Sequence, residues 1–259
     1  MNVGLTGLMA AASQSALAAW WEQTKMEFTL NFIMRDRWKL LLTGLQNTLL
    51  IALFACLIGI ALGLIVAAVR TTWDKTGHVM HKGLGRSVLR VVDWICRVYI
   101  TIIRGTPVVV QLMIMYYIIF ASSDNGVLIA TLAFGFNSGA YVAEIFRGGI
   151  MSIDKGQFEA GRSLGLNYLQ TMWFIIAPQV LKTVLPTLAN EFIVLLKETS
   201  VAGYVAVGDL TFAGNRIRGA TYSAFMPLIA VAIIYLILVM FFSWLVGKLE
   251  RRLRQSDNR

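Results

Sequence analysis

Long uncharged stretches alternate with short polar segments along this chain. The uncharged stretches are Leu40–Val69, Gly105–Ser123, Asn125–Ala143, Ser163–Leu181 and Gly219–Gly247. About 20 predominantly apolar residues cross a bilayer as a helix. The strict alternation of apolar and polar residues that is typical of a membrane β-barrel is absent from these stretches. The pattern therefore predicts an all-α membrane protein.

We expect about five transmembrane helices. The first lies near Leu41–Val69, the second begins near Val98, and the others lie near Val127–Phe146, Thr171–Leu196 and Tyr222–Val246. Residues 40–249 would form the membrane domain, preceded by an N-terminal segment (1–39) and followed by a tail (250–259). Within 1–39, Leu5–Trp21 is predicted to be an interfacial helix anchored by Trp20 and Trp21, and a sixth span is the open alternative.

Several residues predict local features of the spans. Gly59 and Gly63 form a GxxxG face suited to close helix packing. The amphipathic stretch Val88–Val98 favours a surface helix ahead of the second span. Pro107 predicts a kink in that span, and Pro178 with Pro186 predicts a bend in the fourth.

Composition and charge agree with a membrane protein and indicate its orientation. Charged residues make up 14% of the 259 residues, against about a quarter in soluble domains. The predicted topology places fourteen Lys and Arg residues on one face and six on the other. The positive-inside rule then puts the N-terminus outside and the C-terminus in the cytoplasm. The net charge of +9 is explained by topology and attraction to anionic lipid, so no nucleic-acid partner is expected.

A polar, helix-forming island separates the third and fourth spans, from Gly156 to Pro178. Asp154 is suited to cap a short helix, with Gln157 at the capping-box position. Gly165 suits a left-handed helix stop, and Asn167 suits the cap of the next helix. The island is therefore predicted to be a helical hairpin outside the bilayer, with small residues where another protein's surface could approach.

The spacing in this island resembles the EAA loop of ABC-importer permeases. The matching positions are Glu159-Ala160-Gly161, then Gly165, Ile175 and Pro178, with Gly161 and Ala177 departing from the family's Ala and Leu. Further elements (RGTP at Arg104, AYVAEIFRGGI around Glu144, and LLKETS around Lys197) resemble the polar amino-acid uptake group. The resemblance covers about residues 40–249, with the coupling loop near 152–178.

The resemblance implies a type I importer permease subunit in the bacterial cytoplasmic (inner) membrane. It implies two ATP-binding cassette subunits, a second permease subunit (the same chain or a homologue), an extracytoplasmic solute-binding protein and an amino-acid substrate. It also implies that the ATPase docks on Phe158, Glu159, Ala160, Gly161, Leu164 and Gly165. Which amino acid is carried stays open.

Ionisable and polar residues in membrane segments are functional candidates by default. For the substrate pathway these are Arg104, Glu144, Asn190, Glu191, Lys197 and Glu198. Simpler explanations are open for each. Arg104 could extend to the headgroups, and Glu144 could pair with Arg147. The four residues at the far end of the fourth span could lie at an exposed helix end: Asn190, Glu191, Lys197 and Glu198.

The chemistry of an enzyme is not indicated. The sequence has no G-x-x-x-x-G-K-[ST] phosphate loop and no nucleophile–base constellation, so ATP hydrolysis would belong to a partner subunit. Cys56 and Cys96 suggest no disulfide framework, and His78 with His81 lacks a third metal ligand, so no cofactor is expected. The alternative function is an ion-coupled secondary amino-acid transporter, although no paired repeat is visible.

Overall fold

All elements in the described part of the chain are helical. The computed structural model describes residues 17–77, 81 and 83–257, and no strand occurs among them. A helix over residues 17–28 leads into two short turns, η1 (Thr29–Ile33) and η2 (Met34–Asp36). The remaining helices are α2 (Trp38–Thr76), α3 (Leu84–Gly105), α4 (Val108–Ile114), η3 (Met115–Ile119), α5 (Gly126–Ser152), α6 (Lys155–Ser163), α7 (Tyr168–Thr171), η4 (Met172–Ile176), α8 (Ala177–Glu198), η5 (Thr199–Val205), α9 (Leu210–Thr221) and α10 (Phe225–Asp257).

The membrane-crossing capacity of these helices agrees with the predicted number of spans. Within the described residues, four helical segments are long and apolar enough to cross a bilayer: Trp38–Thr76, Gly126–Ser152, Tyr168–Val205 and Phe225–Leu253. A fifth span arises if α3 and the α4–η3 helix are counted together, and these two are bent by 110° at their junction. The all-α membrane fold is thereby confirmed, with the kink expected at Pro107.

The structure corrects the expected start of the second span. We expected a separate surface helix over Val88–Val98, but α3 runs without interruption from Leu84 to Gly105. No glycine or proline lies between Gly85 and Gly105, so nothing in the backbone ends the helix near Val98. The helix is interrupted only where Thr106 adopts an extended conformation before Pro107, as the steric restriction on residues preceding proline favours.

Small residues bring α2 and α5 into close contact, as the GxxxG pattern predicted. A Cβ atom added at Gly59 would lie 2.7 Å from Ser138 Oγ, and one at Gly63 would lie 2.6 Å from Val142 Cγ1. The backbones can approach this closely only because those Cβ atoms are missing. This crossing fixes α5 in the centre of the bundle, where most of its middle residues are buried.

A Gly63→Leu substitution should therefore weaken the fold. The new side chain has no space against Val142, and overpacking of this kind costs about 1–3 kcal/mol. We expect a lower midpoint of thermal unfolding in detergent. Gly148→Leu is the matched control on α5, since nothing lies within 4 Å of its added Cβ. Equal unfolding midpoints for the two variants would contradict the packing assignment.

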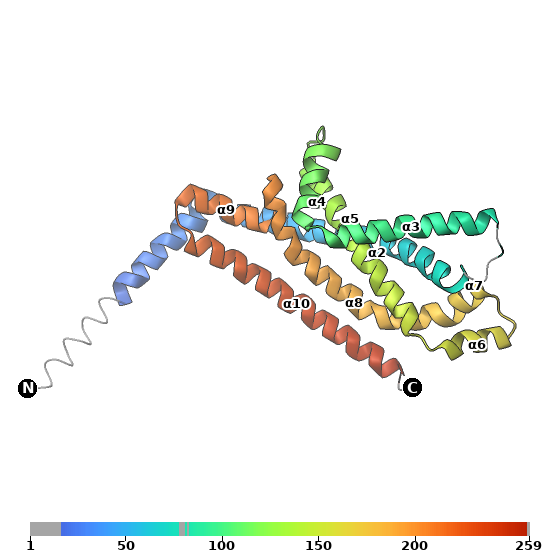
Figure 1. Cartoon of the computed structure of the whole chain (residues 1–259). Helices are drawn as coiled ribbons and strands as arrows, with labels where there is room; N and C mark the ends of the chain where they lie inside the picture. Colours follow the sequence, from blue (N-terminus) through green and yellow to red (C-terminus); the bar gives the residue numbers. More distant parts are fainter. Residues whose placement is uncertain (1–16, 78–80, 82, 258–259) are drawn as a thin grey trace, which may run out of the picture.

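The helices place the polar hairpin and the α9 region at opposite ends of the bundle (Figure 1). The end of α10 and the α6–α7 hairpin lie at one end. At the other end, α9 packs beside the start of α2, and the Thr221 hydroxyl donates to Asn31 Oδ1 at 2.7 Å. The helix over residues 17–28 projects from this second end. Of the interfacial helix expected over Leu5–Trp21, residues up to 16 lie outside the described residues.

Asp209 anchors α9 as its N-cap. Its carboxylate accepts hydrogen bonds from the backbone N–H groups of Thr211 (2.9 Å) and Phe212 (3.0 Å). Burial raises the pKa of this carboxyl, and the two N–H donors oppose that shift. The preceding loop is tied to α2, because Asn47 Nδ2 donates to the Gly208 carbonyl at 2.8 Å. These bonds hold the loop between η5 and α9 against α2.

The two prolines of the fourth span are accommodated differently. The backbone winds as a π-helix over Met172–Ile176, directly before Pro178. The wider π turn leaves room where a proline ring would otherwise clash with the preceding turn. The α-helix then continues through Pro186 to Glu198. The span is thus irregular near the hairpin and regular where it passes the centre of α5.

Candidate functional site

The polar hairpin is built by its capping residues. Asp154 Oδ1 accepts from Gly156 N at 2.6 Å, which begins α6. The helix ends with Leu166 N donating to the Gly161 carbonyl (3.0 Å) and with Gly165 at φ +77°. This left-handed stop is a Schellman motif, for which glycine is strongly favoured.

One capping detail differs from the expectation. The reciprocal capping box is formed by Asn167 and Gln170 at the start of α7, with both hydrogen bonds at 2.9 Å. The side chain of Gln157 instead accepts from Gln179 Nε2 on α8 at 3.3 Å. Gln157 therefore links α6 to the fourth span rather than closing a box with Asp154.

The six predicted coupling residues divide into two groups. Gly161 is buried, and a Cβ added to it would lie 2.6 Å from Thr171 Cγ2. Phe158 is half-buried in the core formed by α5 and α8, with the Lys75 ammonium 4.6 Å from its ring centroid. These two residues hold α6 against the bundle. The exposed members, which could contact another protein, are Glu159, Ala160, Leu164 and Gly165.

The break between α3 and α4 is stabilised by Gln111, which was not among the predicted functional residues. Gln111 Nε2 lies 2.8 Å from the Ile103 carbonyl and 2.8 Å from Thr106 Oγ1, so its amide serves the groups freed by Pro107. Its Oε1 accepts from Asn137 Nδ2 on α5 at 2.9 Å. A glutamine one turn after a helix-breaking proline in an apolar stretch was the available signal.

Two of the predicted pathway residues make separate contacts on neighbouring turns of α5. The Arg104 guanidinium lies 5.4 Å from the centroid of the Tyr141 ring, which precedes Glu144 by one turn. Glu144 itself pairs with Arg147 at 3.0 Å, as the i,i+3 spacing allowed.

Glu191 contacts α5 one turn away from this group. Its Oε1 accepts from Ser138 Oγ at 2.9 Å, so α8 is joined to α5 by a hydrogen bond within the membrane segment. Ser138 is fully buried, and the sequence reading did not single it out. A hydroxyl in the centre of an apolar helix was the signal, although such a group often bonds only to its own helix.

The other three candidates lie in the second half of α8. Asn190 and Lys197 are exposed on the surface of this single chain. Glu198 is half-buried, and the charges of Glu191 and Lys197 act on it. Arg104, Glu144 and Glu191 therefore make three separate contacts on α5, with Tyr141, Arg147 and Ser138 respectively.

A second charged cluster joins α2 to α3. Asp93, which is only 3% exposed, pairs with Arg97 (2.8 Å) and with Arg70 (3.4 Å). Arg97 also approaches Asp74 at 3.6 Å. The two guanidinium groups compensate the negative charge of the buried carboxylate. Removing either of them would leave that charge less compensated and would destabilise the fold. These ion pairs hold the C-terminal part of α2 against the middle of α3.

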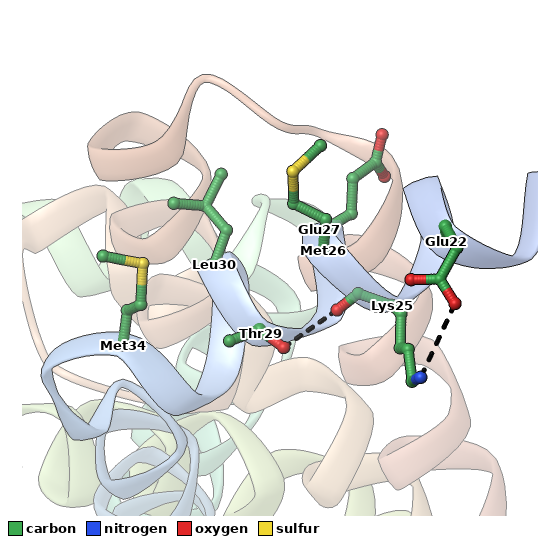
Figure 2. Close-up of a pocket in the computed structure, with 7 residues that line it drawn as sticks. All are labelled: Glu22, Lys25, Met26, Glu27, Thr29, Leu30 and Met34. Carbon is green, nitrogen blue, oxygen red and sulfur yellow. Dashed lines mark hydrogen bonds and ion pairs between the residues drawn. The ribbon is translucent and has the colours of Figure 1, made fainter. Parts of the chain in front are cut away.

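A hollow on the surface near the N-terminal helix does not have the side-chain arrangement of a catalytic site. About 580 Å³ lies along the segment before α2, beside Glu22, Lys25, Met26, Glu27, Thr29, Leu30 and Met34 (Figure 2). These side chains come from successive turns of one helical segment, and Lys25 pairs with Glu22 at 3.7 Å. No metal-binding group of three or more His, Cys, Asp or Glu residues occurs in the described part of the chain, and His78 lies outside it.

Comparisons with known proteins point to a single family. A family model described as "Binding-protein-dependent transport system inner membrane component" matches residues 81–255. The arginine transport system permease protein ArtQ of Bacillus subtilis (strain 168) is 34% identical over 220 residues, covering 84% of this chain and 94% of the relative. The glutamine transport system permease protein GlnP of Escherichia coli (strain K12) is 34% identical over 219 residues, covering 83% and 93%.

Solved structures agree with these sequence matches. The crystal structure of an amino acid ABC transporter with histidines contains a chain that is 36% identical, with a TM-score of 0.73, covering 85% of this chain and 96% of that one. An inward-facing MetNI methionine ABC transporter chain has a TM-score of 0.69 at 21% identity, covering 85% and 98%. The second likeness concerns the fold alone.

Proposed function

Because this chain belongs to the family of binding-protein-dependent transport system inner membrane components, we propose that it is the permease subunit of an ATP-driven importer of polar amino acids. Its relatives include permease proteins of arginine, glutamine and L-cystine transport systems, and these cargoes share a polar or charged character. The observation that supports the proposal most strongly is the exposed face of α6. Capping hydrogen bonds at the ends of α6 and at the start of α7 fix the conformation of the hairpin that carries this face.

Coupling to the ATPase would use that exposed face. Glu159, Ala160 and Leu164 offer a small, mixed polar and apolar surface, and Gly161 keeps α6 seated against Thr171. A force applied to α6 would pass to α5 and α8, because Phe158 packs against their buried core. The movement of these two helices would then open the pathway on alternate sides. This is a shift between two conformations biased by a partner.

The pathway itself would run along the α5–α8 side of the bundle. Glu191 and Ser138 lie there, and Glu144 lies further along α5. Arg104, at the end of α3, contacts Tyr141 of α5. Charged groups at these positions are costly in lipid, so they are expected to face a water-accessible route between subunits. Both signs of charge are present, which suits a substrate that carries an ammonium and a carboxylate.

The orientation follows from the distribution of basic residues. We place the α6–α7 hairpin and the end of α10 in the cytoplasm and the α9 end outside. Two ATP-binding cassette subunits would then meet the hairpins of a pair of permease subunits, either two copies of this chain or this chain with a homologue. A solute-binding protein would deliver the amino acid at the α9 end. The whole would lie in the bacterial cytoplasmic membrane.

The decisive experiment is purification of the chain from its native membrane in mild detergent, with mass spectrometry of the proteins that accompany it. We expect an ATPase that carries a phosphate loop, and the presence or absence of a second permease sequence would define the dimer. Reconstituted complex should take up amino acid with ATP and without an ion gradient. Uptake driven by an ion gradient in the absence of any ATPase would favour the secondary-transporter alternative instead.

A further inference from the structure

A basic cleft lies between the end of α2 and the α6–α7 hairpin. It has a volume of about 490 Å³. Three cationic side chains line it, with one carboxylate, two aromatic rings and two threonines: Lys75, Lys155, Arg162, Glu159, Phe158, Tyr168, Thr76 and Thr171. These residues come from three separate helices, so the tertiary fold creates the cleft.

The charges of the cleft are not balanced within the chain. Among the described residues, Lys75, Lys155 and Arg162 form no ion pair, and Glu159 is the one carboxylate in the lining. Lys75 is held in place over the Phe158 ring at 4.6 Å, which fixes one cation at the wall. The cleft therefore has excess positive charge and suits an anion.

A buried polar atom in the lining also lacks a partner. Thr171 is 2% exposed, and its Oγ1 has no hydrogen-bond partner within the described structure. Buried hydroxyl groups are nearly always hydrogen-bonded, so an orphan of this kind points to a missing donor or acceptor. A ligand oxygen in the cleft would supply it. This observation is independent of the three cations.

The cleft lies close to the outer edge of the headgroup layer. The uncharged stretch of α2 ends at Val69, and Lys75 follows about 9 Å further along the helix axis. The headgroup layer begins at the end of the apolar core and is about 5–8 Å thick. The Lys75 backbone thus lies just beyond this layer, and its long side chain can reach back to the lipid phosphates. Beside the cleft, Leu169 and Trp173 are 74% and 73% exposed, as suits side chains that meet the membrane interface.

We propose that this cleft binds the phosphate-bearing headgroup of an anionic phospholipid of the inner leaflet. Lys75, Lys155 and Arg162 would surround the phosphate, and the Thr171 hydroxyl would donate to one of its oxygens. The acyl chains would leave the cleft past Leu169 and Trp173. The inference rests on the orientation given under the proposed function, which puts the hairpin on the cytoplasmic side. A bound lipid would brace α6 against the end of α2, beside the exposed face that Glu159 shares.

The test measures lipid binding to the full chain by native mass spectrometry, with phosphatidylglycerol and phosphatidylcholine as probes. The variant replaces all three cations: Lys75→Gln, Lys155→Gln and Arg162→Gln. Each cation near an anionic membrane surface contributes roughly a fivefold gain in affinity. We therefore expect phosphatidylglycerol binding to weaken about a hundredfold, with phosphatidylcholine binding unchanged.

A matched control and a milder variant accompany it. Lys248→Gln removes a cation that lies 5.3 Å from the Trp244 ring on α10, the same kind of contact outside the cleft, and should leave binding unchanged. Thr171→Val keeps the shape of the side chain and removes only the hydroxyl, so a loss of a few-fold is expected. Midpoints of thermal unfolding show whether each variant is folded.

Three results would overturn the proposal. Equal phosphatidylglycerol binding by the triple variant and the Lys248→Gln control would remove the cleft as a lipid site. Full competition by inorganic phosphate would identify a site for the free anion. Normal lipid binding with lost ATPase association would make the cleft part of the docking surface for the ATPase. Because lipid binding is measured without ATPase or transport, failure of the transport proposal would leave this test intact.

Discussion

A Gly165→Arg variant is expected to insert into the membrane normally and to lose transport-coupled ATP hydrolysis. Gly165 ends α6 at φ +77° with nothing within 4 Å of an added Cβ, so the substitution disturbs no internal packing. A non-glycine residue in this conformation costs about 1–2 kcal/mol. The long cationic side chain would stand at the exposed end of α6, where the ATPase is proposed to approach.

The expected loss of coupled ATP hydrolysis can be derived from the binding free energy of central interface contacts. Truncating or obstructing a central contact costs about 2 kcal/mol or more, which corresponds to at least roughly a thirtyfold fall in coupled turnover. The measurement is substrate-stimulated ATPase activity of the reconstituted complex, with membrane insertion followed by fractionation.

Gly165→Asn separates the two causes of that loss. Asparagine tolerates the left-handed conformation and is small, so this variant should keep most of the activity. If both variants were inactive, the Schellman turn itself would be the requirement. Normal coupled turnover in Gly165→Arg would remove the exposed end of α6 from the docking surface.

Glu191→Gln is expected to reduce amino-acid uptake by about 10- to 100-fold, since interactions of a charged group contribute about 1.5–3 kcal/mol. Glutamine keeps the shape of the side chain and can still accept from Ser138 Oγ, which lies 2.9 Å away. The change therefore removes the charge and retains the link between α5 and α8. Uptake of labelled amino acid into proteoliposomes, together with basal ATPase activity, is the measurement.

Ser138→Ala is the complementary variant. It removes the hydrogen bond and leaves the carboxylate in place, so a role for the charge predicts a smaller loss of uptake than in Glu191→Gln. A larger loss in Ser138→Ala would make the α5–α8 link the essential feature. Wild-type uptake by Glu191→Gln would show that the carboxylate has only a packing role.

The regular parts of this fold could be read from local sequence. The spans follow from the length of the uncharged stretches, because lipid leaves the backbone no hydrogen-bond partner outside its own helix. Gly165 and Asn167 were identifiable because capping depends on a few adjacent residues. The GxxxG face on α2 could also be predicted from the sequence. The residues of α5 that pack against it, Ser138 and Val142, could not.

The predictions that differed from the structure, and the residues that were missed, have two causes. The continuous α3 was divided near Val98 because amphipathic and apolar segments looked like separate elements, although no backbone signal ended the helix. Gln111 and Ser138 were overlooked because their importance depends on partners 26 residues away in Asn137 and 53 residues away in Glu191. Hydropathy and spacing contain no information about such distant contacts.

The sequence by itself determined that this protein is a helical membrane protein with a capped hairpin between its third and fourth spans. It also determined the resemblance to importer permeases. Only the tertiary structure decided which face of α6 is free, which residues of α5 the ionisable side chains contact, and that three helices line a basic cleft. The physical reason is that capping and hydropathy are local properties, whereas burial and charge pairing depend on which helices pack together.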